Sequence, residues 1–199
     1  MNERNLILAS ASPRRRDLLE TLNLNFTVEP SNIDESEITE PEPEKLTLRL
    51  ACEKARQVAA GENRGIFLAA DTVVYYQNKI LEKPSSLQEA EEMLRFLRDS
   101  THRVITGVFL LDNSSGSTKE LKRYDETLVK MRNYSQKELE GYIDSQEPMG
   151  KAGGYAIQGL GSLLVEKIEG SYFTVVGLPL HIVGEMLNEI GSGILTGCK

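Results

Sequence analysis

The residues best suited to chemistry near the start of the chain are Ser10-Ala11-Ser12-Pro13-Arg14-Arg15. Ser12 suits the N-cap of a helix and Pro13 its first position, so the N–H groups of that first turn would point outward, where anions bind. Arg14 and Arg15 would add two permanently charged, forked donors that match phosphate oxygens. The pattern is equally typical of an ordinary capped helix with solvated arginines, and spacing alone leaves both interpretations open.

Three further charged residues occupy positions that a site could use. Asp71 follows the apolar run 66–70, so we expect its carboxylate at a strand end, where α/β sheets place ligand clefts. There it could hold a metal ion or accept a proton from water, although an Asp that caps the turn into Thr72 explains the position equally well. Lys54 lies in a helical pattern and Lys83 is held extended by the proline after it, but a lone Lys is usually a surface residue.

Several familiar site signatures are missing. The chain has no G-x-x-x-x-G-K-[ST], no strand-linked G-x-G-x-x-G, no H-E-x-x-H and no G-x-S-x-G, which argues against P-loop, dinucleotide-binding, zincin and serine hydrolase sites. His102 and His181 stand apart, so we expect them to be packing or surface residues. Cys52 and Cys198 form no disulfide framework and no zinc spacing, which fits a reducing compartment.

Composition narrows the class of protein. The chain has 199 residues, 40% of them hydrophobic and 27% charged, which predicts a single domain over residues 1–199. The formal charge of -7 argues against nucleic acid as a partner, although cations gathered in one place could still bind a polyanionic small molecule. The apolar run 6–9 is far shorter than a signal-peptide core or a spanning helix, so we expect a cytoplasmic protein without membrane contact.

Strand-like and helix-like patterns intermix along the whole chain, which predicts an α/β protein with a mixed sheet and helices packed on it. The polar stretch 32–44 has the composition of a flexible loop and could act as a lid. Strands are expected at 5–9, 26–29, 66–70, 73–76, 80–81, 103–111, 119–131 and 163–168. Helices are expected at 17–22, 44–60, 89–98, 135–143 and 179–190.

Five separated blocks resemble the Maf family and follow its order through nearly the whole chain. They are Ser10-x-Ser12-Pro13-Arg14-Arg15-x-x-Leu18-Leu19, Ala70-Asp71-Thr72-Val73-Val74, Leu81-Glu82-Lys83-Pro84, Lys151-Ala152-Gly153-Gly154-Tyr155-x-Ile157-Gln158-Gly159 and Val175-Val176-Gly177-Leu178-Pro179. The resemblance implies an ITPase-like (Maf/Ham) α/β fold with an elongated mixed sheet and two lobes around a central cleft.

The resemblance also implies an activity, that of a nucleoside triphosphate pyrophosphatase. Such an enzyme is a hydrolase of acid anhydrides that uses a divalent cation, Mg or Mn, to release nucleoside monophosphate and pyrophosphate. By this likeness Asp71 is the catalytic base, and Asp71 and Glu35 are the metal ligands. The residues matching family positions that line the phosphate pocket are Ser12, Arg14, Arg15, Lys54 and Lys83.

Within the family, Thr72 and the Ile157-Gln158-Gly159 segment resemble the branch that acts on dTTP and UTP. There the positions of Arg14, Thr72 and Gln158 influence the choice of substrate. A carboxamide both donates and accepts a hydrogen bond, which suits the imide edge of thymine or uracil. Two alternatives stay open, a nucleotide-responsive regulator of septum formation with little turnover and a pyrophosphatase for modified purine nucleotides. The choice between a monomer and a homodimer also stays open.

Overall fold

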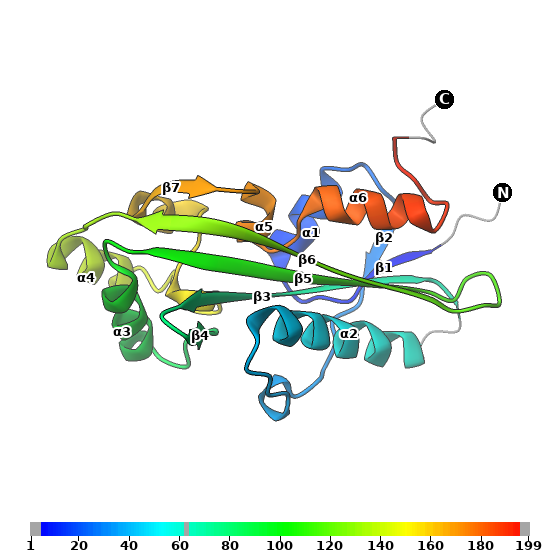
Figure 1. Ribbon diagram of the computed structural model, residues 1–199, viewed down its shortest axis with the longest axis horizontal. Coiled ribbons are helices and arrows are strands. Elements are labelled where there is room, and N and C mark those ends of the chain that lie inside the picture. Colours follow the sequence, from blue (N-terminus) through cyan, green and yellow to red (C-terminus); the bar gives the residue numbers. More distant parts are fainter. Residues whose placement is uncertain (1–4, 62–63, 196–199) are drawn as a thin grey trace. The chain divides into compact units, whose positions relative to one another are not determined.

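The computed structural model describes residues 5–61 and 64–195, which places Cys198 outside the described residues. Strands and helices intermix along the chain (Figure 1). The strands are β1 (Leu6–Leu8), β2 (Phe26–Val28), β3 (Ile66–Tyr76), β4 (Lys79–Leu81), β5 (Thr101–Asp112), β6 (Lys119–Met131) and β7 (Val165–Glu169). The α-helices are α1 (Pro13–Glu20), α2 (Pro43–Gly61), α3 (Leu87–Leu97), α4 (Gln136–Asp144), α5 (Tyr172–Val176) and α6 (Leu180–Glu189). Short 3₁₀ helices are η1 (Glu35–Glu37), η2 (Ala152–Gly154) and η3 (Gly159–Leu164).

The described strands form one mixed sheet in the order β2-β1-β3-β5-β6-β7, with β4 paired to β3. β1 runs parallel to both β2 and β3, with Leu8 opposite Val28 and Leu68. β4 is antiparallel to β3, and β7 is antiparallel to β6. The α/β class with a mixed sheet and packed helices, predicted from the intermixed strand and helix patterns, is therefore confirmed.

The chain divides into two compact units. The first unit comprises residues 1–71, 106–125 and 177–199, and the second comprises residues 72–105 and 126–176. Strands β3, β5 and β6 each contribute residues to both units. The expectations of one domain over residues 1–199 and of a cleft between two lobes stay predictions.

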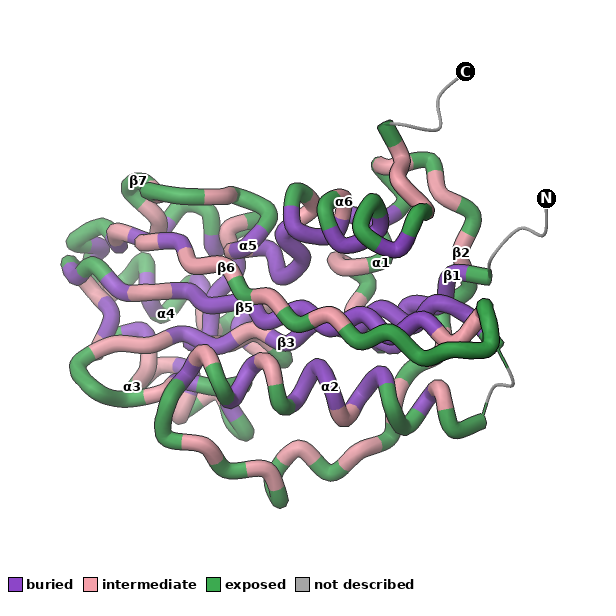
Figure 2. Tube along the Cα trace, turned by 45° about the vertical axis from the view of Figure 1, so that its right-hand side comes forward, coloured by how far each residue is buried: buried purple, intermediate pink, exposed green. Residues whose placement is uncertain are grey.

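The core of the first unit lies between α2 and the sheet. Side chains on one face of a strand recur every second residue, and those on one face of a helix every three or four residues. Gly107 of β5 lets α2 approach closely, because an added Cβ would lie 2.6 Å from the backbone carbon of Thr47. Figure 2 shows buried positions along both α2 and the strands it crosses. The buried residues of this cluster are Ile7, Ala9, Ala51, Cys52, Ala55, Val58, Phe67, Ala69, Phe109 and Leu111.

A second hydrophobic cluster forms the core of the other unit. It joins β3 and β5 to helices α3 and α4, and it includes Tyr134, whose hydroxyl donates to the Leu94 carbonyl over 2.5 Å. Local signals set the ends of these helices, since Ser86 caps α3 and Ser135 forms a capping box with Glu138 at the start of α4.

Strand β3 corrects the prediction that Asp71 stands at a strand end. β3 runs unbroken from Ile66 to Tyr76, so Asp71 lies in its interior and the predicted strands 66–70 and 73–76 are one element. The strand pairs with β1 at Leu68 and with β4 at Val74, and this pairing on both sides of Asp71 holds the backbone extended through it.

Smaller differences concern the ends of elements. Helix α1 begins at Pro13 with Ser12 as its N-cap, as the Ser12-Pro13 signal predicted, so the helical run expected at 17–22 starts four residues too late. The expected strand 163–168 begins only at Val165, since the preceding residues form η3, and α5 was not expected.

Within the described part of the chain, no helix combines the length and the apolar character needed to cross a membrane.

Candidate active site

Lys54 and Asp71 meet within the first unit because each lies on the buried face of its own element, Lys54 on α2 and Asp71 on β3. Asp71 shares its strand face with Phe67 and Ala69, the face that α2 covers. Lys54 follows Ala51 by three residues, which places it in the buried stripe of α2. The two side chains therefore meet in the layer between helix and sheet, where Asp71 is 4% exposed and Lys54 5% exposed.

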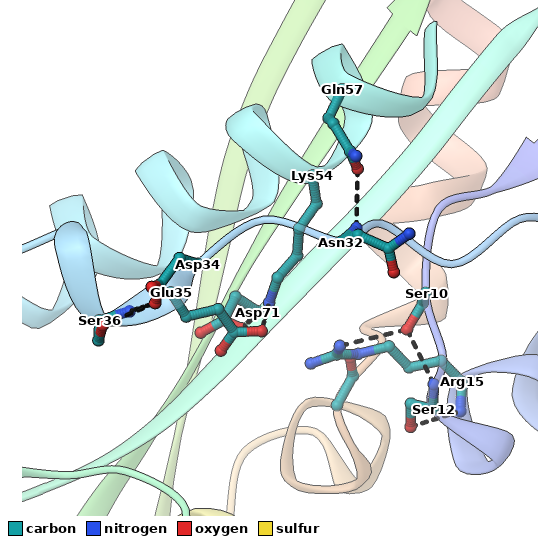
Figure 3. Close-up of polar contacts among 11 residues, drawn as sticks. Ser10, Ser12, Arg15, Asn32, Asp34, Glu35, Ser36, Lys54, Gln57 and Asp71 are labelled. Carbon is teal, nitrogen blue, oxygen red and sulfur yellow. Dashed lines mark hydrogen bonds and ion pairs between the residues drawn. The ribbon is translucent and has the colours of Figure 1, made fainter. Parts of the chain in front are cut away.

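Lys54 binds two carboxylates at once (Figure 3). Its Nζ donates to Oδ1 of Asp71 over 2.6 Å and lies 2.9 Å from Oε1 of Glu35. Two negative charges and one positive charge thus converge at one point. A buried charge is costly unless it is paired, so the ammonium group offsets part of the cost of burying Asp71.

Glu35 is placed by a short turn in the polar stretch 32–44. Asp34 caps η1 and accepts hydrogen bonds from the Ser36 hydroxyl over 2.6 Å and the Ser36 N–H over 3.0 Å, and these bonds lower the pKa of Asp34. The N–H of Asn32 donates to Oε1 of Gln57 over 2.8 Å, which ties the segment to α2. A lid function of this stretch stays a prediction.

Arg15 is held by contacts of its backbone and of its guanidinium group (Figure 3). Its backbone N–H donates to Oγ of Ser12 over 3.4 Å, and its Nε donates to the Gly177 carbonyl over 2.8 Å. The Ser10 hydroxyl oxygen accepts from the Ser12 N–H over 3.2 Å and from Nη1 of Arg15 over 3.5 Å. The guanidinium is thus held in place by backbone and hydroxyl oxygens.

Charges from the rest of the cluster act on Arg15. Burial lowers the pKa of its guanidinium, the Asp71 carboxylate raises it, the positive charge of Arg14 lowers it, and Glu35 raises it. Arg14, Arg15, Glu35 and Asp71 all belong to the first unit. An Arg remains charged across the physiological range, so the cluster offers fixed positive charge beside two carboxylates.

Two carboxylates of the cluster, Asp71 and Glu35, could hold a divalent cation. Mg²⁺ is commonly held by one or two carboxylates together with substrate phosphates and water. Here both carboxylates contact the ammonium group of Lys54. In residues 5–61 and 64–195, no group of three or more His, Cys, Asp or Glu side chains is placed to hold a metal ion.

The remaining predicted residues belong to the second unit. Thr72 follows Asp71 in β3 and is half-buried, whereas Lys83 and Gln158 are exposed. Gln158 precedes η3 in the glycine-rich segment, and Lys83 follows β4. In the first unit, the structure brings Glu35, Lys54 and Asp71 into direct contact and joins Ser12 to Arg15, which follows Arg14 in α1. Substrate binding by Thr72, Lys83 and Gln158 stays a prediction.

Two groups that hold Arg15, the Ser10 hydroxyl and the Gly177 carbonyl, were not predicted as parts of the site, and the burial of Lys54 was not expected. Ser10 and the Gly177 carbonyl orient Arg15, and nothing local to Arg15 in the sequence points to residue 177. Lys54 carried a usable signal, because a charged residue within an apolar helical stripe is a candidate for a buried partner.

Comparisons with known proteins extend over almost the whole chain. The family described as Maf-like protein matches residues 5–190. A dTTP/UTP pyrophosphatase of Methanosarcina barkeri is 44% identical over 192 residues, which cover 96% of this chain and 96% of that protein. A dTTP/UTP pyrophosphatase of Moorella thermoacetica is 47% identical over 186 residues, which cover 94% and 95%.

Similarity to solved structures is much weaker. A HAM1 protein from Coxiella burnetii is 16% identical, with a TM-score of 0.45 over 67% of this chain and 76% of that chain. This likeness carries no argument about the site.

Proposed function

The chain belongs to the Maf family, as its five sequence blocks predicted, and on this premise we propose that it hydrolyses dTTP and UTP to the nucleoside monophosphate and pyrophosphate. Two relatives that are 44% and 47% identical over nearly their full lengths bear the name dTTP/UTP pyrophosphatase, which supports this choice of substrates. The structural observation that carries the proposal is the contact of both Asp71 and Glu35 with Lys54, with Arg15 in the same unit.

Each group has a role that its contacts suit. Arg14, Arg15 and the start of α1 neutralise the negative charge of the phosphates, which is the main demand of phosphoryl chemistry. Lys54 donates to Oδ1 of Asp71 and so fixes the orientation of the carboxylate that accepts the proton of the attacking water. The water oxygen bonds to the α-phosphorus, and the bond from that phosphorus to the bridging oxygen breaks to release pyrophosphate.

A divalent cation, Mg or Mn, completes the proposed site. Asp71 and Glu35 would hold it, and when bound it supplies further neutralisation of the phosphate charge. The proposed compartment is the cytoplasm, where nucleoside triphosphates are made.

A substrate screen with one matched pair of variants tests the proposal. The eight common nucleoside triphosphates and modified purine nucleotides are incubated with Mg or Mn, and pyrophosphate release is measured. The wild-type protein should prefer dTTP and UTP, and Asp71→Asn should lower kcat by roughly three orders of magnitude or more while the protein stays folded.

The matched control is Asp112→Asn, because Asp112 is also a buried carboxylate of the first unit and accepts from the Ser114 N–H over 2.9 Å. This variant should retain turnover. Near-normal activity of a folded Asp71→Asn protein removes Asp71 from the mechanism, and a preference for modified purines overturns the substrate assignment.

A further inference from the structure

The segment that carries Gln158 is held by side chains on both sides of it, and the following inference rests on the proposed function. Gln158 is exposed and lies between η2 and η3, and residues 155–158 belong to no helix or strand. A carboxamide discriminates between bases only if its donor and acceptor are correctly placed, and irregular backbone does not supply that placement by itself.

The upstream contact joins Tyr155 to His102. The Tyr155 hydroxyl lies 2.6 Å from Nε2 of His102, and the two rings meet edge to face with centroids 5.4 Å apart. His102 is 1% exposed and Tyr155 is 5% exposed. His102 belongs to β5, so the contact connects the position three residues before Gln158 to a strand of the second unit.

The downstream contact is made by Glu147, which lies between α4 and η2. Its Oε2 accepts from the N–H of Leu160 over 3.0 Å, and its Oε1 accepts from the N–H of Gly161 over 2.9 Å. Burial alone would raise the pKa of Glu147, but these two N–H groups, together with the Tyr142 hydroxyl and the positive charge of Lys151, lower it, so the group is a carboxylate at neutral pH. It binds the backbone two and three residues after Gln158.

Gly159 makes the downstream contact sterically possible. Its φ is +70°, and a Cβ at this position would lie 2.7 Å from Oε2 of Glu147. The glycine next to Gln158 therefore serves the approach of the carboxylate as well as the turn of the backbone.

We propose that His102, acting through Tyr155, and Glu147 are positioning residues that hold the Gln158 backbone on either side and thereby set the preference for uracil and thymine over cytosine. Neither group needs to touch the nucleotide. Both act on backbone that the base-reading side chain shares, within one unit of the protein.

Two matched pairs of variants separate positioning from stability. Tyr155→Phe removes one buried hydroxyl, and its control, Tyr134→Phe, removes another from the same hydrophobic cluster. Glu147→Gln weakens a carboxylate bound to backbone N–H groups, and its control, Glu138→Gln, weakens the carboxylate that accepts from the Ser135 N–H over 2.7 Å.

The measured quantity is the ratio of kcat/KM for UTP to kcat/KM for CTP, which differ only in the base, together with Tm. Tyr155→Phe and Glu147→Gln should lower this ratio by about tenfold, whereas the two controls should keep it even where Tm falls equally. His102→Leu should lower the ratio, and His102→Gln, which retains a hydrogen-bonding amide, should restore much of it.

Amide hydrogen exchange adds a readout that does not depend on turnover. Exchange of the Leu160 and Gly161 amides should quicken in Glu147→Gln and stay unchanged in Glu138→Gln. A wild-type protein that releases no pyrophosphate from dTTP or UTP refutes the proposed function. If the wild-type protein prefers UTP to CTP and the Tyr155→Phe and Glu147→Gln variants keep this ratio, the positioning role is refuted and the proposed function stands.

Discussion

Replacing His102 with Gln should remove a pH dependence of stability that burial creates. Burial lowers the pKa of His102 from its ordinary 6.5 to about 4. The unfolded chain therefore binds more protons than the folded chain between these values, and stability falls as the pH falls through this window. One pKa unit corresponds to about 1.4 kcal/mol, so protonation of the unfolded-state ring costs about 2 kcal/mol of stability between pH 7 and pH 5.

Urea unfolding at pH 7 and at pH 5 measures this difference in the free energy of unfolding. Far-ultraviolet circular dichroism monitors the unfolding, because the chain contains no Trp. The free energy of unfolding should fall by about 2 kcal/mol more in the wild type than in His102→Gln, since the other titrating groups are common to both proteins. His181→Gln is the matched control, because it removes the other histidine, whose side chain is 52% exposed. The His181→Gln variant should therefore lose as much stability between pH 7 and pH 5 as the wild type does.

Two results would contradict this reasoning. Equal losses of stability in the wild type and His102→Gln would mean that the ring is not kept neutral by burial. A wild type that becomes more stable toward pH 5 relative to His102→Gln would mean that folding favours the protonated ring, through a partner other than the Tyr155 hydroxyl.

The remaining predictions concern the site. Arg15→Ala should weaken binding of dTTP by roughly 1.5 to 3 kcal/mol, the cost of a lost charge-assisted contact, and calorimetric titration without metal would show an unchanged Kd if the phosphates lie elsewhere. Gln158→Leu should lower kcat/KM for dTTP far more than for ATP; equal losses would exclude Gln158 from base recognition. Lys54→Met should lower the free energy of unfolding by about 3 to 5 kcal/mol, because it leaves Asp71 buried beside an apolar side chain. Adding Asp71→Leu should recover much of that loss, and additive losses in urea unfolding would show that the pair is not coupled.

Local signals in the sequence predicted much of the fold. The expected bounds 119–131 match β6, and the Ser12-Pro13 and Ser135 signals identified the caps of α1 and α4. Capping and strand patterns depend on neighbouring backbone groups and on the alternation of side chains, which a sequence displays directly. The strand end expected at Asp71 was wrong because pairing of β3 with β1 and β4 maintains the strand where the apolar run ends.

The sequence by itself determined the α/β class, most helix and strand positions, and the motif residues from which the family was identified. The tertiary structure alone decided which of these side chains meet. Lys54 contacts Asp71 across 17 residues, His102 contacts Tyr155 across 53, and Arg15 contacts Gly177 across 162. Backbone conformation follows from short-range sterics and periodic burial, whereas such partnerships depend on strand order, register and the face that each helix covers, and these are set only when the chain packs.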